Sequence, residues 1–470
     1  MQPNIILITT DQQRYDGLGI NGNEILQTPH LDALASKGTN FSNAYSTCPV
    51  CIPARRTLLT GLHPTSHGLT KYQDGVEFNP PFTLPGLLRD EGYQTQLIGK
   101  LHLHPQRKRF GFDNIILSET PWPKPYSNVH SENDYERWLK RQGVQTHPCL
   151  NGMGNNSRIG RPFHLDENVH HSNWLVQETV DFLNHKRDPS CPFYLHLSFW
   201  APHPPFTPPA FYYDRYKDED PKTITSKWTP EIEEMPSGLP TDSVTGPFNK
   251  TELKSMQAGY YGLINHLDDC ISYLLLELAQ SKYGDQPTYI VFTTDHGEML
   301  GDHQLFRKSL PYEGSAHIPF FISSNNISLS KNSSKDLVSL EDIPPTILDL
   351  AGVNIPDQMD GKSLKNIIHD SSQKLNRTTL FGECGGQFSN QWLRHNNLKY
   401  IWFPKTNQEQ IFDLEKDPKE LNDISGNQDI SSQLRELMKE HLKDREEVLY
   451  EINSLEPLNN RPPRVFWKED

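Results

Sequence analysis

The most informative segment of this 470-residue chain is Cys51-Ile-Pro-Ala-Arg-Arg-Thr-Leu-Leu-Thr-Gly61. Pro53 suits the first turn of a helix and Gly61 suits its end, so the stretch predicts a helix that starts just after Cys51. The dipole and the free backbone N–H groups of a helix start favour negative charge, so a nucleophile at Cys51 would lie in a favourable field. Arg55 returns to the same end of that first turn.

On both sides of this stretch, short apolar runs alternate with helical patterns. Strands of one main sheet are predicted at 4–10, 93–99, 193–199, 288–294 and 319–322. Helices are predicted at 28–38, 82–92, 169–186, 253–280 and 345–351. This alternation predicts an α/β fold, in which a large mixed, mostly parallel sheet is sandwiched by helices. Residues 105–166 lack periodicity and are expected to form an irregular excursion near a substrate cleft, and residues 323–335 a polar loop.

The pattern changes after Gly352. Short strands are predicted at 379–383, 398–403 and 410–414, and a charged helix at 430–452. These elements predict a small C-terminal antiparallel α+β subdomain. We therefore expect two domains, a catalytic α/β domain over residues 1–370 and a C-terminal subdomain over residues 371–470.

Composition restricts the class of protein. The chain has 45 basic and 59 acidic residues, a formal net charge of −14, which argues against nucleic acid or an anionic membrane as a partner. No apolar stretch approaches the length of a membrane helix. No signal peptide is visible after Met1, which predicts a cytoplasmic protein. A leader removed beforehand would leave no trace, so a secreted or periplasmic location stays open.

Polar residues follow the predicted strands at the points where these end. In chain order they are Asp11 and Gln12, Lys100 and His102, His203, Asp295 and His296, with Lys308 just beyond. Because the carboxyl ends of parallel strands meet at one edge of a sheet, we expect these side chains to lie together. Carboxylate, amide and imidazole groups could hold a hard divalent cation, while the basic groups could hold a tetrahedral anion. A metal, fixed cations and an anion are what the cleavage of a phosphate or sulfate ester requires.

The motifs resemble those of one known family. Cys-x-Pro-x-Arg followed by Leu-Thr-Gly, at Cys51 to Gly61, is similar to the signature of the sulfatase family, within the alkaline-phosphatase-like superfamily. Further elements in the expected order resemble other parts of that family: Gly99-Lys100-Leu101-His102, Thr294-Asp295-His296-Gly297-Glu298, Arg307-Lys308 and Phe412-Asp413-Leu414-Glu415-Lys416-Asp417-Pro418. The resemblance covers about residues 4 to 420.

The resemblance implies hydrolysis of the sulfate ester of a small molecule or carbohydrate, and leaves the particular ester undecided. A separate formylglycine-generating enzyme would oxidise Cys51 to Cα-formylglycine, whose hydrated aldehyde attacks sulfur. The implied metal ligands are Asp11, Gln12, Asp295, His296 and modified Cys51. Ca²⁺ is the expected metal, and Mg²⁺ or Mn²⁺ would be chemically plausible. Arg55 would steady the diol, His102 would transfer protons, and Lys100, His203 and Lys308 would neutralise the sulfate and the leaving oxygen.

Two alternatives remain open at this point. Many sulfatases have Asp where Gln12 stands and Asn where His296 stands, and the Gln/His combination also occurs in related phosphonate monoester hydrolases. A phosphonate or phosphate ester hydrolase with the same nucleophile is therefore the first alternative, although Lys100 and His102 favour a sulfatase. An inactive binder of sulfated glycans is the second.

Cys48-Pro-Val-Cys51 also allows a redox pair or half of a zinc site. No thioredoxin-like unit surrounds the pair and no further soft ligands lie nearby in the sequence, so we interpret Cys48 as an incidental neighbour of the nucleophile precursor.

Overall fold

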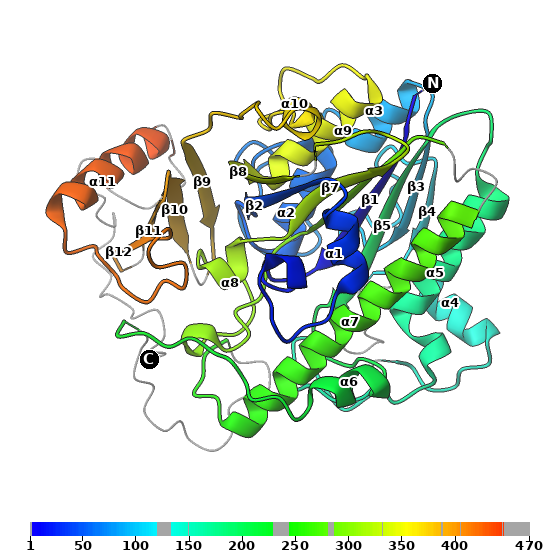
Figure 1. The fold of residues 1–470 in the computed structure, drawn as a ribbon, viewed down its shortest axis with the longest axis horizontal. Coiled ribbons are helices and arrows are strands. Elements are labelled where there is room, and N and C mark those ends of the chain that lie inside the picture. Colours follow the sequence, from blue (N-terminus) through cyan, green and yellow to red (C-terminus); the bar gives the residue numbers. More distant parts are fainter. Residues whose placement is uncertain are drawn as a thin grey trace.

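The computed structural model describes residues 2–119, 133–148, 150–228, 244–280, 286–330, 332–386, 389–404, 406–443 and 445. An eight-stranded mixed sheet forms its centre, and a four-stranded antiparallel sheet lies beside it (Figure 1). The order in the main sheet is β4-β3-β5-β1-β6-β7-β2-β8. Only β7 runs antiparallel to its neighbours among these described strands. The predicted α/β class with a mostly parallel sheet is confirmed.

The strands of the main sheet are β1 (Asn4–Asp11), β2 (Thr39–Tyr45), β3 (Gln94–Gly99), β4 (Asn114–Leu117), β5 (Phe193–Pro202), β6 (Thr288–Thr294), β7 (Phe320–Asn325) and β8 (Asn332–Ser339). The helices are α1 (Pro29–Ala35), α2 (Cys51–Thr60), α3 (Leu84–Asp90), α4 (Asp134–Arg141), α5 (His171–Asp181), α6 (Ala210–Tyr216), α7 (Lys250–Gln280), α8 (Glu313–Ala316), α9 (Ile343–Ala351), α10 (Lys365–His369) and α11 (Gln428–Leu442). The small sheet contains β9 (Thr379–Cys384), β10 (Asn390–His395), β11 (Leu398–Phe403) and β12 (Gln408–Asp413).

The main sheet is buried on both faces because helices cover each of them. Along β1, Ile6 and Ile8 face a core built with α5 and α7, while Ile5 and Leu7 face a core built with α2, α3 and α9. This alternation follows from the two-residue period of a strand. A strand covered on both faces favours apolar residues on both faces, which explains the continuous apolar run at 5–8.

The small sheet also has two buried faces. Trp392, Ile401 and Phe412 pack against the body that carries the main sheet, and the intervening residues, such as Leu393 and Tyr400, pack against α11. The sheet therefore connects α11 to the rest of the fold (Figure 1). The predicted boundary at residue 370 falls between α10 and β9, and the division into two domains stays a prediction.

Several predicted elements differ from the structure. Residues 332–335, predicted as a loop, begin β8, which pairs in parallel with the unpredicted strand β2. β8 is the edge strand of the sheet and β2 is its neighbour, and both carry many polar side chains, so their sequences lack a strong apolar pattern. The region 105–166, predicted to be irregular, contains β4 and α4, and β10 was not predicted. The charged helix predicted over 430–452 ends at Leu442, and most of the remainder lies outside the described residues.

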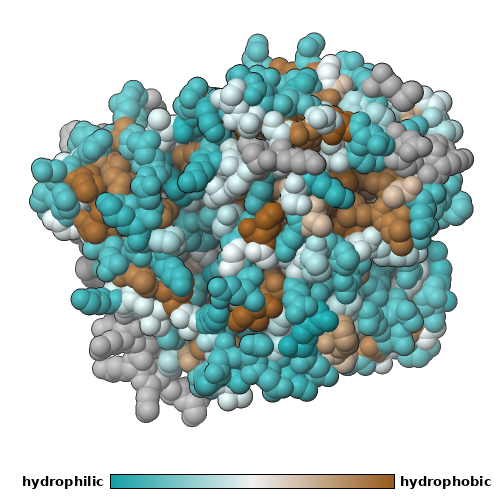
Figure 2. All heavy atoms as spheres, viewed as in Figure 1, coloured by the Kyte–Doolittle hydropathy of each residue, from teal (hydrophilic) through white to brown (hydrophobic). Residues whose placement is uncertain are grey.

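Hydrophilic residues cover most of the face of the molecule drawn in Figure 2, with hydrophobic patches scattered between them. None of the helices in the described part of the chain is long and apolar enough to cross a membrane.

A buried ion pair at the small sheet yields a test of this packing. Lys399 of β11 has a fully buried side chain that pairs with Glu313 at 2.5 Å and with Glu420 at 2.9 Å. Lys399→Met would leave the buried Glu420 carboxyl without its cation and would leave Glu313 the ion pair with His317, so we expect the free energy of unfolding to fall by about 3–5 kcal/mol. Urea denaturation measures it. The control is Lys416→Met, whose side chain is 82% exposed. Equal denaturation midpoints for the two variants would contradict this packing.

Candidate active site

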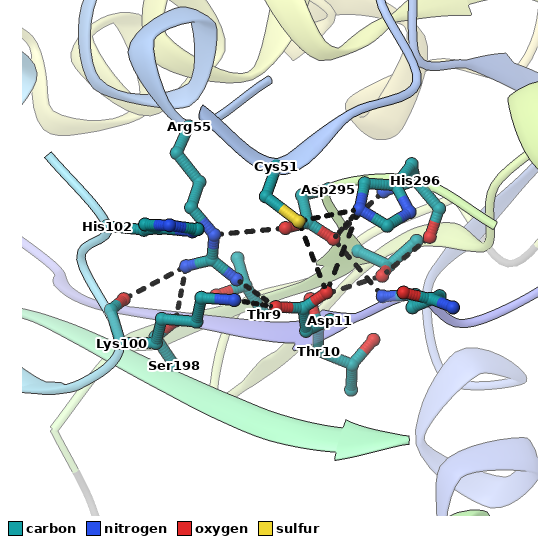
Figure 3. A network of polar contacts seen from close by, with 12 residues as sticks. Thr9, Thr10, Asp11, Cys51, Arg55, Lys100, His102, Ser198, Asp295 and His296 are labelled. Carbon is teal, nitrogen blue, oxygen red and sulfur yellow. Dashed lines mark hydrogen bonds and ion pairs between the residues drawn. The ribbon is translucent and has the colours of Figure 1, made fainter. Parts of the chain in front are cut away.

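The ends of four neighbouring parallel strands bring the predicted residues together. Asp11 ends β1, and β1 pairs in parallel with both β5 and β6. Lys100 directly follows β3, His203 follows β5, and Asp295 and His296 follow β6. Helix α2 begins at Cys51, so its N-terminus meets the same edge of the sheet (Figure 3). The expectation that these side chains lie close together is confirmed by their contacts, whereas their chemical roles stay predictions.

A compact group of atoms of the kinds that bind metals lies at this edge. Asp11, Cys51, Asp295 and His296 are fully buried and each offers one ligand atom, all within 4.8 Å of one another. Cys51 Sγ lies 3.1 Å from His296 Nε2 and 3.8 Å from Asp11 Oδ1. His296 Nδ1 lies 3.0 Å from the Gly297 carbonyl oxygen, to which it can donate, and this leaves Nε2 as the ligand atom. Two carboxylates and an imidazole in this arrangement fit a divalent metal.

Gln12 lies beside this group, and a residue that we did not predict fixes its amide. The Gln12 Nε2 group donates to Glu298, which is buried and also accepts a 2.9 Å bond from the Leu300 N–H. The Gln12 oxygen therefore points the other way and accepts from Lys308 Nζ at 2.5 Å. A carbonyl oxygen oriented like this is available as a neutral metal ligand. Glu298 lies within the quoted segment after β6, but its contact with Gln12 depends on the fold.

Arg55 and Lys100 neutralise the two carboxylates. Arg55 donates from Nε to Asp295 at 3.0 Å, and its Nη2 lies 3.5 Å from Asp11 (Figure 3). Its Nη1 donates to the Lys100 carbonyl and to Ser198 Oγ, so the guanidinium is held from several sides. Lys100 Nζ pairs directly with Asp11. Burial opposes ionisation of Asp11, but Lys100 and the other nearby basic groups outweigh it and hold the pKa of Asp11 well below its usual range.

The same basic groups act on Cys51. Burial and the Asp11 carboxylate disfavour its thiolate, yet Lys308 and Lys100 outweigh them and lower the pKa of the thiol well below its usual value. The position therefore stabilises a negative charge, as the helix start at Cys51 led us to expect.

Gly99 shows why the second motif begins with glycine. Its φ of +114° lies in the left-handed region, and a Cβ atom here would approach the Ser198 carbonyl oxygen to 1.9 Å. Only glycine allows β3 to lie this close to β5 and still turn so that Lys100 enters the site.

His102 is held by two acidic residues that the sequence did not reveal. Its backbone N–H donates to Glu119 at 2.9 Å, and its Nε2 lies 3.7 Å from Asp74 Oδ1. The Tyr72 hydroxyl donates to the other oxygen of Asp74 at 2.8 Å. The His102 ring holds the pKa of Asp74 below its usual range. Burial and Lys100 oppose protonation of His102, but Asp74 and Cys51 outweigh them and raise the pKa of the ring.

A cavity of about 370 Å³ opens onto these groups. Its lining includes Cys51, Lys100, His102, His203 and Lys308, all of which the sequence predicts for the site, together with Tyr72, Trp200 and Arg307. Burial and then Lys308 lower the pKa of His203 to about 3, so its ring is neutral at pH 7. The expected role of His203, to neutralise the sulfate and the leaving oxygen, stays a prediction.

Comparisons with known proteins agree with this geometry. A family model described as Sulfatase matches residues 3–353, and one described as N-sulphoglucosamine sulphohydrolase, C-terminal, matches residues 301–447. An arylsulfatase of Clostridium perfringens is 40% identical to this chain, and the alignment covers 97% of each protein.

Two solved structures share the fold. A phosphonate monoester hydrolase of Agrobacterium radiobacter has a TM-score of 0.77 and 23% identity, covering 98% of this chain and 100% of its own. A protein solved with its substrate D-glucosamine-2-N,6-O-disulfate has a TM-score of 0.71 and 21% identity, covering 95% and 99%. At these identities the likeness concerns the fold alone. The family model spans most of the chain and the arylsulfatase matches almost all of it, and so the chain belongs to the sulfatase family and is a hydrolase of sulfate esters.

Proposed function

We propose that this sulfatase matures at Cys51, holds one Ca²⁺ and cleaves the sulfate ester of an alcohol about one ring in size. The observation that carries the proposal is the joint burial of Asp11, Cys51, Asp295 and His296 within 4.8 Å, beside a cavity that Cys51 also lines. The maturation step requires a separate formylglycine-generating enzyme that acts on Cys51.

The donor set favours Ca²⁺. Asp11, Asp295 and Gln12 would supply hard oxygen atoms, and His296 would supply one nitrogen. When the metal and formylglycine are in place, the hydrated aldehyde supplies the nucleophile and the metal offsets its negative charge. Arg55 keeps the two carboxylates oriented through its bonds to both. Gln12 is neutral, so the carboxylates contribute two negative charges to the shell, and these match the charge of a divalent cation.

Lys100 and Lys308 would bind the sulfate group. Both lysines line the cavity beside Cys51. Lys100 pairs with Asp11, and Lys308 donates to the amide oxygen of Gln12. Two fixed ammonium groups stabilise the charge of a transferring sulfuryl group without reorganising, and this lowers the barrier.

His203 would donate a proton to the leaving oxygen. Its Nδ1 lies 2.7 Å from the Pro204 carbonyl oxygen, so in the neutral ring Nδ1 carries the hydrogen and Nε2 is free to accept a proton. A bound sulfate ester would bring negative charge near Lys308 and Lys100 and would raise the pKa of His203. A ring protonated in this way donates from Nε2 to the departing alcohol.

His102 would move a proton at residue 51, with Asp74 as its positioning residue. The Nδ1 atom of His102 is buried and has no hydrogen-bond partner among the described residues, while Nε2 faces Asp74. A carboxylate near Nε2 favours the tautomer that carries its hydrogen there, which leaves Nδ1 to accept a proton. Tyr72 fixes Asp74 in turn.

Aromatic side chains shape the part of the cavity that would take the alcohol. Trp200 stacks on His171 at 3.6 Å between ring centres and donates to the Ser118 carbonyl at 2.9 Å. Tyr135 meets Trp200 edge-on. A wall held this rigidly suits the flat face of an aromatic or sugar ring.

The role of Asp74 is tested by Asp74→Asn. We expect kcat to fall by about tenfold to a hundredfold with KM nearly unchanged, because His102 loses the group that orients it but the sulfate-binding lysines remain. Steady-state kinetics with an aryl sulfate measures both constants. The control is Asp90→Asn, a surface aspartate whose side chain is 67% exposed. An unchanged kcat in Asp74→Asn would refute the positioning role.

The metal proposal is tested by chelation. Enzyme dialysed against a chelator should lose turnover, and Ca²⁺ should restore it at a lower concentration than Mg²⁺, because Mg²⁺ gives up its water reluctantly and demands a strict octahedron. Metal content is measured by atomic absorption. Full activity in metal-free enzyme would overturn the metal site, and better restoration by Mg²⁺ or Mn²⁺ would overturn the assignment of Ca²⁺.

The substrate proposal is tested by a panel of esters. We expect kcat/KM for an aryl sulfate to exceed that for an aryl phosphonate monoester and a bis-aryl phosphate. We also expect a sulfated monosaccharide to react faster than the same sulfate inside a polysaccharide. A higher kcat/KM for the phosphonate would instead support phosphonate monoester hydrolysis, the alternative suggested by the combination of Gln12 and His296. Faster turnover of the polysaccharide would refute the ring-sized pocket.

A further inference from the structure

The sequence pairs Cys48 with Cys51, but the structure gives Cys48 a different neighbour. Cys51 faces His296 and Asp11, whereas Cys48 forms a small buried cluster with Val50 and Cys384. Cys48 is 1% exposed and Cys384 is 2% exposed. Cys384 is the last residue of β9 in the small sheet, far from Cys48 in the chain.

The backbone fixes the two cysteines against each other. The N–H of Glu383 donates to the Thr47 carbonyl at 2.7 Å, and the N–H of Gly385 donates to the Thr70 carbonyl at 2.7 Å. The thiol of Cys48 donates to the same Thr70 carbonyl at 3.4 Å. Glu383 is therefore bound to the loop that carries Cys48, and Gly385 is bound to the same Thr70 carbonyl that accepts from the Cys48 thiol. Burial and a hydrogen bond with the Cys384 thiol raise the pKa of Cys48.

We propose that Cys48 and Cys384 form a reversible disulfide that fastens the loop before the nucleophile to the small sheet. The oxidant is a small-molecule disulfide such as oxidised glutathione. The thiolate of one cysteine attacks a sulfur of this disulfide, forms a mixed disulfide and releases one thiol. The second cysteine attacks the protein sulfur of the mixed disulfide and releases a second thiol. Two protein thiols are oxidised, one external disulfide is reduced, and the two protons leave with the released thiols.

The bond would stabilise a segment on which the site depends. The carbonyl of Pro49 accepts from the N–H of Ser309, the residue next to Lys308, and the Ser309 carbonyl accepts from Asn390 of β10. The loop that precedes Cys51 and the loop that carries Lys308 are thus already tied to the small sheet by hydrogen bonds. A covalent link would resist the separation of these parts and would leave the geometry of the site unchanged.

The reaction should be slow in the folded protein. Both thiols are buried and the pKa of Cys48 is raised, so the attacking thiolate forms only when the loop opens. The same burial should slow the reduction of a formed disulfide, so both reactions need a long incubation. Cys51 does not compete for Cys48 in the mature enzyme, because residue 51 is then no longer a thiol. The proposal does not depend on the sulfatase reaction.

The test compares mature enzyme incubated with oxidised glutathione and with dithiothreitol. Each sample is denatured, alkylated and digested without reduction, and the masses of its peptides are measured by mass spectrometry. We expect a cross-linked peptide containing Cys48 and Cys384 in the oxidised sample only. Its mass should equal the sum of the two reduced peptides minus two hydrogen atoms. Alkylation of both residues in the oxidised sample, or their pairing with other thiols, would overturn the proposal.

Thermal unfolding of the same samples tests the consequence. The oxidised enzyme should have a higher Tm and an unchanged kcat. Cys384→Ser should abolish the difference in Tm, whereas the control Cys270→Ser, which removes another buried thiol, should retain it. An equal Tm for the oxidised and reduced forms of the unaltered enzyme would refute a stabilising link. The measurement on unaltered enzyme stands even if a variant fails to fold.

Discussion

The site depends on the burial of two carboxylates, Asp11 and Asp295, at the ends of the paired strands β1 and β6. Like charges removed from water repel each other, and burial together with Asp11 raises the pKa of Asp295. Arg55 and Lys100 compensate from within the protein. A divalent cation would take over part of this compensation and would free Lys100 for the substrate. The arrangement of strands, helix and basic residues at this edge serves to keep these two groups charged and close together.

This constraint also explains how an acidic protein can bind an anion. The net charge of −14 describes the whole chain, whereas Lys100 and Lys308 gather beside Cys51 in one cavity. Two carboxylates matched by one metal leave the lysines free to act on the substrate. The replacement of a carboxylate by Gln12 is consistent with this balance, and Glu298 fixes which end of its amide faces Lys308.

The residues at strand ends could be predicted from the sequence, because the end of a strand appears locally, as an apolar run followed by a polar residue. Asp11 and Asp295 were found in this way, and the start of α2 was placed to within one residue. Asp74, Glu298 and the pairing of Cys48 with Cys384 could not be found. Their partners lie far away in the chain, so only the folded backbone brings them together.

The edge strand β8 and its neighbour β2 were missed for a related reason. Their polar residues are satisfied by neighbouring strands and by solvent, so no apolar period marks them. The central strands, by contrast, contain continuous apolar runs because helices cover both of their faces. The part of the molecule that the sequence predicts best is therefore its most deeply buried part. The candidate metal ligands Asp11, Asp295 and His296 also lie there.

The most direct test of maturation at Cys51 is the mass of the peptide that contains this residue, in enzyme isolated from its native host. We expect formylglycine at this position, with a reactive aldehyde that an aldehyde-specific reagent labels. An unmodified cysteine there, in enzyme that still turns over a sulfate ester, would contradict this expectation.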